Sequence, residues 1–200
     1  MRHFLIIAVF LSCQIAWAME GVLVQGKGGI PLADAVVYID SPGSRVKSPL
    51  NGQIAQKDKR FMPAVTVVRV GSSVSFPNQD TVRHHVYSFS PAKSFDIRLY
   101  SGTPANPVVF DKPGLVVLGC NIHDWMLAYV KVVDSPWFGK TDARGGLVLS
   151  DVPAGEHVLR VWYPGLLREW TRKVSFPLAK TLVIDLAIAS QATAAPPEDY

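Results

Sequence analysis

The sequence predicts an all-β fold, and three observations support this. From Gly21 onward, short segments of alternating apolar and polar residues recur between turn residues, as in β-sandwiches and barrels. Glycine and proline, which most often interrupt regular structure, each occur 15 times. Beyond the N-terminus, no stretch of about ten residues carries apolar side chains at helical spacing. With 200 residues, 48% of them apolar, the chain can build one large core or two small ones.

The N-terminus has the pattern of a secretory signal peptide. A short basic start, Met1-Arg2-His3, precedes an apolar stretch, Phe4–Cys13, and Ala16-Trp17-Ala18 forms a cleavage site. The apolar stretch is shorter than the ~20 residues that span a bilayer. We therefore expect residues 1–18 to be removed, no integral membrane segment to remain, and the mature protein to be periplasmic.

The strand candidates follow one another along the mature chain. They are three to eight residues long, which is ordinary for strands. In chain order they are residues 22–24, 35–39, 65–70, 74–76, 86–89, 95–99, 115–118, 127–133, 147–149, 158–163 and 182–189. Residues 190–200 include Ala-Pro-Pro-Glu-Asp and have little to bury, so we expect a disordered tail.

Two portions of the chain look like halves of one domain. Gly21–Ile39 resembles the first hairpin of carboxypeptidase-regulatory-like, or transthyretin-like, domains, and Thr141–Trp162 resembles their second half. About a hundred residues separate the two portions, whereas that family has only a few there. We therefore expect a small sandwich, residues 19–48 and 135–189, that is interrupted by an inserted domain, residues 49–134. The alternative is two consecutive sandwiches, with the first portion belonging to the first of them.

The expected insert carries a set of metal-binding side chains. A strand candidate runs into Cys120, and the order Cys-x2-His-x2-Met places a thiolate, an imidazole and a thioether on one short loop through His123 and Met126. A second imidazole comes from His84 or His85, about 35 residues earlier. This donor set suits both Cu(I) and Cu(II), whereas zinc rarely takes methionine. Haem attachment and iron–sulfur clusters need further cysteines, and removal of the signal peptide leaves Cys120 alone. The sequence thus predicts one copper ion per chain.

The same residues resemble the cupredoxins, the small blue-copper proteins of the plastocyanin, pseudoazurin and amicyanin type. The spacing Cys-x2-His-x2-Met is similar to the short amicyanin loop, His84-His85-Val86 is similar to the family's His-Asn-Val, and the resemblance covers about Ile54 to Val133. The chain also looks like proteins labelled methylamine-utilisation proteins. The cupredoxin resemblance implies a Greek-key β-sandwich over residues 49–134 and the copper ligands His84, Cys120, His123 and Met126.

The choice between the two adjacent histidines stays open. Neighbouring residues on a strand face opposite sides, so only one of His84 and His85 can face Cys120. The register of the His-x-Val motif favours His84, but a bulge at the strand end would exchange the two. His85 is therefore the alternative ligand.

Composition and motifs narrow the function. The chain has 20 basic and 16 acidic residues without a basic run, so we expect no nucleic-acid binding. Neither a phosphate-binding glycine loop nor His-Glu-x-x-His is present, and the mature chain keeps too few histidines for a multicopper oxidase, so we expect no enzyme. We expect a type 1 copper protein that carries single electrons between redox partners such as a cytochrome or a dehydrogenase. The alternatives are a copper delivery or storage protein, and a β-sandwich binding module in which copper is structural.

Overall fold

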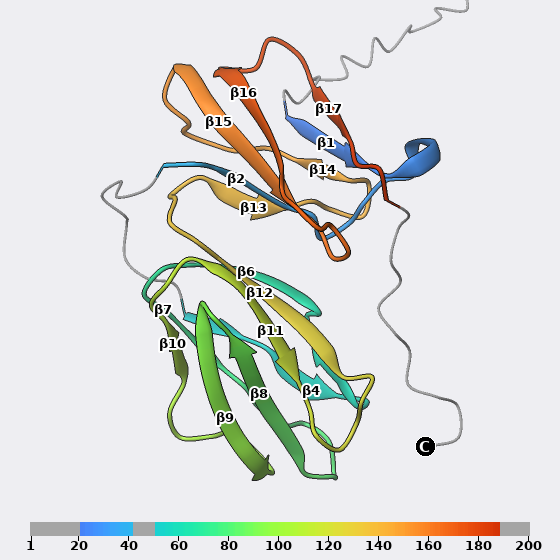
Figure 1. The fold of residues 1–200 in the computed structure, drawn as a ribbon, viewed down its shortest axis with the longest axis vertical. Helices are drawn as coiled ribbons and strands as arrows, with labels where there is room; N and C mark the ends of the chain where they lie inside the picture. The colour runs from blue at the N-terminus through green and yellow to red at the C-terminus, as the bar shows by residue number, and fades with distance from the viewer. Residues whose placement is uncertain (1–20, 42–50, 189–200) are drawn as a thin grey trace, which may run out of the picture.

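The computed structural model describes residues 21–41 and 51–188 of the chain (Figure 1). In these ranges the chain forms strands and one 3-10 turn, η1 (Lys27–Gly29), but no α-helix, so the predicted all-β fold is confirmed. No helix in this part of the chain has the length and apolarity that crossing a membrane requires. The expected signal peptide, residues 1–18, and the expected tail, residues 190–200, lie outside the described residues.

The lower half of the molecule in Figure 1, which we call the lower sandwich, consists of two sheets and a hairpin. The larger sheet has the strand order β6-β12-β11-β8-β9, the smaller has the order β10-β7-β3, and β4–β5 is the hairpin. Pairing is antiparallel except between β6 and β12 and between β3 and β7. The strands are β3 (Asn51–Gln53), β4 (Ala55–Lys57), β5 (Arg60–Met62), β6 (Val65–Arg69), β7 (Ser72–Ser75), β8 (His84–Ser90), β9 (Lys93–Tyr100), β10 (Val108–Phe110), β11 (Gly114–Gly119) and β12 (Leu127–Val133).

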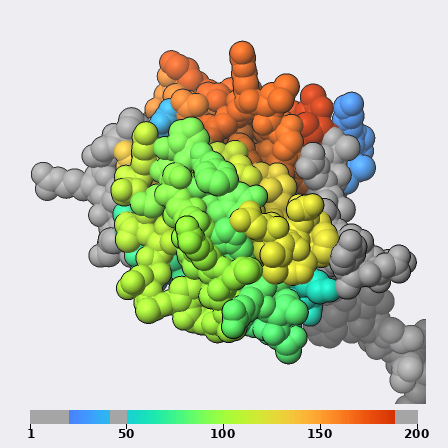
Figure 2. All heavy atoms as spheres, turned by 60° about the horizontal axis from the view of Figure 1, so that its bottom comes forward, coloured from blue at the N-terminus to red at the C-terminus, as the bar shows by residue number. Residues whose placement is uncertain are grey.

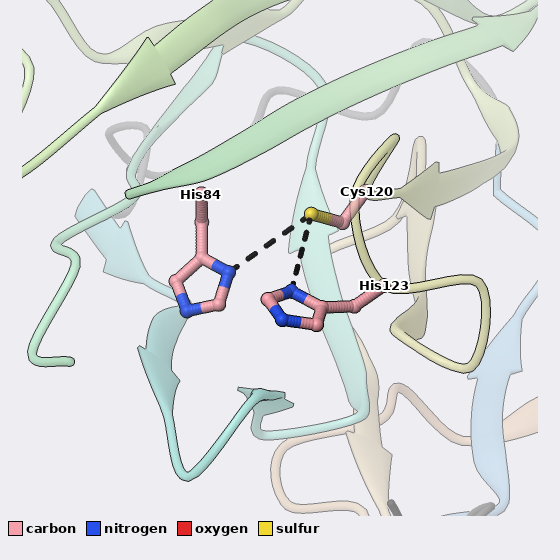
Figure 3. Close-up of side chains that lie close together, drawn as sticks. All are labelled: His84, Cys120 and His123. Carbon is pink, nitrogen blue, oxygen red and sulfur yellow. Dashed lines mark hydrogen bonds between the residues drawn. The ribbon is translucent and has the colours of Figure 1, made fainter. Parts of the chain in front are cut away.

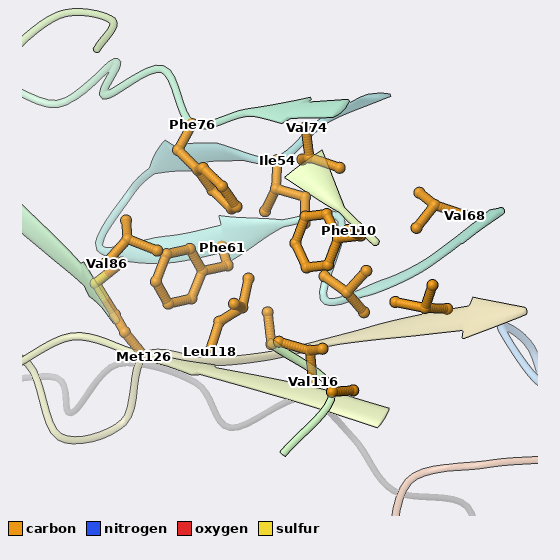
Figure 4. Close-up of a cluster of buried hydrophobic side chains, with 14 of the residues drawn as sticks. Ile54, Phe61, Val68, Val74, Phe76, Val86, Phe110, Val116, Leu118 and Met126 are labelled. Carbon is orange, nitrogen blue, oxygen red and sulfur yellow. The ribbon is translucent and has the colours of Figure 1, made fainter. Parts of the chain in front are cut away.

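Alternating side chains build the core of the lower sandwich. In β11, Val116 and Leu118 are fully buried whereas Val117 between them is 37% exposed, because successive side chains point to opposite faces of a sheet. Phe76 and Phe110 enter the same cluster from the side of the smaller sheet (Figure 4). Burying each such side chain contributes about 1.5–3 kcal/mol. This core holds β8 and β11 in the positions from which the candidate site is built.

The upper half of Figure 1, which we call the upper sandwich, consists of the sheets β13-β2-β15-β16 and β14-β1-β17. Its first two strands precede the lower sandwich in the chain, and its other strands follow it. Ile39 pairs with Leu159, and Val22 pairs with both Leu147 and Leu182. The strands are β1 (Val22–Gln25), β2 (Val36–Ile39), β13 (Phe138–Lys140), β14 (Gly146–Leu147), β15 (Gly155–Trp162), β16 (Trp170–Phe176) and β17 (Leu182–Asp185).

The two sandwiches pack against each other through a small apolar cluster. Trp162 of β15 lies with its ring centre 5.4 Å from that of Tyr129 in β12. Beside these rings, Lys131 pairs with Glu169, which also accepts a hydrogen bond of 2.7 Å from the hydroxyl of Tyr38. The buried members of the cluster are Val36, Tyr38, Val65, Val133 and Trp162.

The sequence pattern missed five three-residue strands and one exposed strand. β3, β4, β5, β10 and β13 have three residues each, too few for a visible alternation. β16 was missed because most of its side chains are polar and exposed. Two expected strands are shorter than predicted: residues 147–149 contribute only Leu147, which pairs with β1, and residues 182–189 end as a strand at Asp185.

Candidate metal centre

The candidate site lies where β8 begins and β11 ends. These strands are antiparallel neighbours, joined by the pair Gly119 and Tyr87, so the end of one lies beside the start of the other. His84 is the first residue of β8, Cys120 directly follows β11, and His123 lies in the loop that leads to β12. Figure 2 brings this end of the lower sandwich forward and shows that loop, in yellow, at the surface beside green segments near β8.

Three side chains converge at this position (Figure 3). The sulfur of Cys120 lies 4.0 Å from Nδ1 of His84 and 3.9 Å from Nδ1 of His123. The donor atoms of all three residues lie within 4.8 Å of one another. His84 is fully buried and Cys120 is 3% exposed, whereas His123 is partly exposed. The structure thus brings together three predicted candidates: Cys120 and His123 from one loop and His84 from a separate strand.

The donor set fits a thiophilic metal ion. Metal–sulfur bonds of about 2.3 Å and metal–nitrogen bonds of about 2.0 Å separate the two donors by at most about 4.3 Å. The two observed sulfur–nitrogen distances of 4.0 and 3.9 Å fall within that limit. One thiol and two imidazoles, with no carboxylate among the grouped donors of the described residues, are the equatorial donors that copper takes in blue-copper sites.

Met126 is buried next to this cluster. It is 2% exposed and belongs to the same apolar core as Cys120. Its backbone N–H donates a 3.0 Å hydrogen bond to the carbonyl of His123, which closes the loop into a tight turn. Figure 4 shows the side chain at the edge of the core, near Val86 and Leu118. Its role as a metal ligand stays a prediction.

His85 faces away from the cluster. Its Nε2 contacts a carboxylate oxygen of Asp96 in β9, and its ring centre lies 5.5 Å from that of Tyr87. The register of β8 against β9 shifts between His84 and Val86, so an irregularity of the kind that could exchange the two histidines does occur here. Even so, His84 and not His85 is the residue grouped with the cysteine.

Asp80 is a residue of the site that the sequence analysis missed. Its Oδ2 lies 2.7 Å from Nε2 of His84, on the opposite side of the ring from the cysteine. Burial raises the pKa of Asp80, but hydrogen bonds from the backbone of Lys59 and Asp58 and from His84 outweigh this and hold the pKa below its usual value. The available clue was an aspartate in the loop directly before the histidine strand, because carboxylates often orient metal-binding histidines.

Trp125 packs beside the partly exposed imidazole of His123 at the edge of the candidate site. The indole Nε1 of Trp125 donates a 3.1 Å hydrogen bond to the carbonyl of Lys59, and its ring centre lies 5.1 Å from that of His123. Burial lowers the pKa of His123, and the nearby His84 and Lys59 lower it further. These influences favour the neutral imidazole, which is the form that binds metal ions.

Solved copper proteins resemble part of the chain, although no protein-family model and no curated protein matches it. A copper-containing nitrite reductase from Thermus scotoductus SA-01 is 24% identical with a TM-score of 0.40, over 48% of this chain and 25% of that one. A purple cupredoxin from Nitrosopumilus maritimus is 22% identical with a TM-score of 0.36, over 41% of this chain and 99% of that one. The P52G mutant of amicyanin, in its reduced Cu(I) form, is 16% identical with a TM-score of 0.38, over 48% of this chain and 98% of that one. This chain therefore spans about a quarter of the nitrite reductase.

Proposed function

We propose that this protein binds one copper ion per chain and carries single electrons between redox partners. The observation that carries the proposal is the convergence of one thiol and two imidazoles whose donor atoms lie within 4.8 Å of one another. His84, Cys120 and His123 would hold the metal, and the thioether of Met126 would be its weakest ligand. Bound copper would supply a one-electron couple between Cu(I) and Cu(II).

The protein's own contribution is a rigid and mostly dry set of ligands. His84 and Cys120 are fixed by adjacent strands of a packed sheet and are buried. Such side chains move little when the charge of a bound ion changes, which keeps the reorganisation of the site small. His123 is partly exposed, and its neighbour Ile122 is 47% exposed. We therefore expect a redox partner, such as a cytochrome or a dehydrogenase, to approach the imidazole edge of His123.

The proposal includes the organisation of the whole chain. Residues 1–18 would direct export to the periplasm, and residues 49–134 would form a cupredoxin-like domain inserted into a carboxypeptidase-regulatory-like sandwich made of residues 19–48 and 135–189. The pairing of β2 with β13 and β15 supports such an insertion, because it joins strands from before and after the lower sandwich. The upper sandwich would then present the copper domain and take no part in the electron transfer.

Visible absorption and electron paramagnetic resonance of the purified protein with equimolar Cu(II) test the proposal. We expect an intense thiolate-to-copper band, saturation at one copper per chain, and reversible bleaching by a mild reductant. Cys120→Ser should abolish the band while the protein stays folded. His157→Ala, which removes a histidine of β15, is the control and should leave the spectrum unchanged.

Two results would contradict the proposal. Wild-type protein that binds Cu(II) without a thiolate-to-copper band would rule out a type 1 site. A colourless Cu(I) form that readily gives its metal to a chelator would indicate copper delivery or storage in place of electron transfer.

A further inference from the structure

The carboxylate of Asp80 is held between the backbone of a turn and the imidazole of His84. Its Oδ1 accepts a 2.8 Å hydrogen bond from the amide of Asp58, and its Oδ2 accepts one of 3.0 Å from the amide of Lys59. The same Oδ2 lies 2.7 Å from Nε2 of His84. The amide of Asp80 in turn donates a 2.9 Å hydrogen bond to the side-chain oxygen of Asn78. The carboxylate therefore has little freedom to rotate away from the histidine.

The turn itself has an unusual backbone. Asp58 and Lys59 form the two-residue loop of the hairpin β4–β5, and both have a φ of 53°. Positive φ at both central residues defines a type I′ turn, which normally uses asparagine and glycine. Residues with larger side chains keep this conformation only where their surroundings hold it. Both amides of the turn are directed at Asp80, which supplies that hold.

The turn also contacts the loop that carries the other candidate ligands. The carbonyl of Lys59 accepts the hydrogen bond from Trp125, which lies between His123 and Met126 in the chain. One side of the turn thus contacts the cysteine loop, and the other side contacts the histidine of β8 through Asp80. These contacts link the two separate parts of the chain that supply the site.

We propose that Asp80 is a positioning residue that selects the tautomer of His84 and, through it, sets the preference of the site for Cu(II). A carboxylate that accepts two backbone hydrogen bonds can only accept from the imidazole as well, so Nε2 must carry the hydrogen. In the neutral imidazole Nδ1 then has no hydrogen, and it faces the sulfur of Cys120. The second half of the proposal, the metal preference, rests on the proposed function.

The negative charge of Asp80 adds an electronic effect to this orientation. A carboxylate that accepts from the far nitrogen of a ligating imidazole makes that imidazole a stronger donor. Stronger donation stabilises the more highly charged Cu(II) relative to Cu(I), and therefore lowers the reduction potential. Asp96 offers an internal comparison, because it makes the same type of contact to His85, which faces away from Cys120.

The tautomer is tested on the metal-free protein. Nitrogen-15 NMR of the histidine side chains at mildly alkaline pH should show, in the wild type, a protonated Nε2 and an unprotonated Nδ1 for His84. Asp80→Ala should give a mixture of tautomers at this residue alone. A wild-type spectrum with the hydrogen on Nδ1 would overturn the proposal. This measurement needs neither copper nor a stable variant, so it decides the tautomer even if substitutions at Asp80 prevent folding.

The metal preference is tested by potentiometry on the copper-loaded protein. Asp80→Asn should weaken binding of Cu(II) relative to Cu(I) about tenfold, which for a one-electron couple raises the reduction potential by about 59 mV. Asp96→Asn removes the same charge and should leave the potential close to that of the wild type. Equal shifts in both variants would mean a general charge effect, and no shift in Asp80→Asn would mean a structural role only. Either result overturns the second half of the proposal.

Failure of this proposal can be distinguished from failure of the proposed function. A wild-type protein without a thiolate-to-copper band contradicts the proposed function, while the NMR result still decides the tautomer of His84. A protein with the band whose potential is insensitive to Asp80→Asn keeps the proposed function and loses the metal preference assigned to Asp80.

Discussion

Met126 is the weakest of the four proposed ligands, and its replacement should separate metal retention from redox preference. Met126→Gln offers an amide oxygen, a harder donor that favours Cu(II), so we expect one bound copper and a reduction potential lowered by about 59 mV for a tenfold change in relative affinity. The buried amide should also lower the stability by about 1–3 kcal/mol. Metal analysis, potentiometry and thermal unfolding measure these effects. Met62→Gln, at a methionine that is 49% exposed, is the control. An unchanged spectrum and potential in Met126→Gln would show that Met126 is not a ligand.

Asp142 should make part of the stability dependent on pH. Its Oδ1 accepts hydrogen bonds of 2.9 Å from the amide of Gly146 and 2.8 Å from that of Arg144, and these lower its pKa in the folded protein. A carboxyl with a lowered folded pKa contributes stability above its unfolded pKa, about 3.9, and loses it as the pH falls through the folded value. We therefore expect Asp142→Ala to lower the midpoint of thermal unfolding at neutral pH, and the difference from the wild type to shrink below about pH 4. A difference in unfolding midpoint that is as large below about pH 4 as at neutral pH would contradict this explanation.

At the residue scale, spacing was enough to predict the candidates on the cysteine loop, whereas the choice of His84 needed the fold and Asp80 was missed. Cys120, His123 and Met126 share one short loop, so their spacing alone indicates a common site. The contribution of His84 required the alternation of a strand, which left His85 open until the fold showed the direction of each ring. Asp80 depends on a turn more than 20 residues earlier in the chain. No spacing rule connects the two, because their contact exists only in the tertiary structure.

At the scale of elements, the hydrogen bond between Trp125 and the β4–β5 turn should stiffen the loop between β11 and β12. Trp125→Phe keeps an aromatic side chain but removes the indole N–H that donates to the carbonyl of Lys59. A neutral hydrogen bond contributes about 1 kcal/mol, so local opening should become about fivefold more frequent. Hydrogen exchange of the Met126 amide, which is bonded within the loop, measures this opening.

Trp137→Phe is the matched control for that experiment. It removes an indole donor to the carbonyl of Asp151 in the upper sandwich, with a similar hydrogen bond of 2.8 Å. We expect it to leave exchange of the Met126 amide unchanged. If both variants accelerate that exchange equally, the effect is a global loss of stability and the loop is not held by the turn.

Elements were predicted well where a strand is long and rich in buried apolar residues. Burial alternates along the middle of β11, whereas Val130–Val133 of β12 are all buried. The expected segment 115–118 falls within β11, and 127–133 matches β12. Three-residue strands carry no period of their own and exist because a neighbouring strand pairs with them, as β2 does with β13 (Phe-Gly-Lys). Their existence follows from the neighbouring strand, so a single segment of sequence does not reveal it.

At the scale of the whole molecule, Trp162 should couple the stability of the two sandwiches. It is 5% exposed and belongs to the apolar cluster between them. Replacing a buried aromatic residue by alanine costs about 3–5 kcal/mol. In the wild type we expect urea unfolding followed by the copper band and by far-ultraviolet circular dichroism to coincide. In Trp162→Ala the circular dichroism transition should separate and move to lower urea.

Leu167 provides the control for this prediction. Its side chain is fully exposed, so Leu167→Ala should change the stability by no more than about 0.5 kcal/mol. Transitions that still coincide at an unchanged midpoint in Trp162→Ala would show that the interface contributes nothing to cooperativity.

The order of strands along the chain also determines the order in which they can pair during synthesis. β2 is made early, but β13 and β15, with which it pairs, are made about a hundred residues later. All strand pairs of the lower sandwich, in contrast, join residues between Asn51 and Val133, so that sandwich can fold as soon as this stretch is complete. Until the strands after Val133 are made, β1 and β2 carry unpaired backbone groups and apolar side chains, which are prone to aggregate. β1 and β2 thus need protection in the nascent chain, and the half that carries the candidate metal site can fold before the other half has closed.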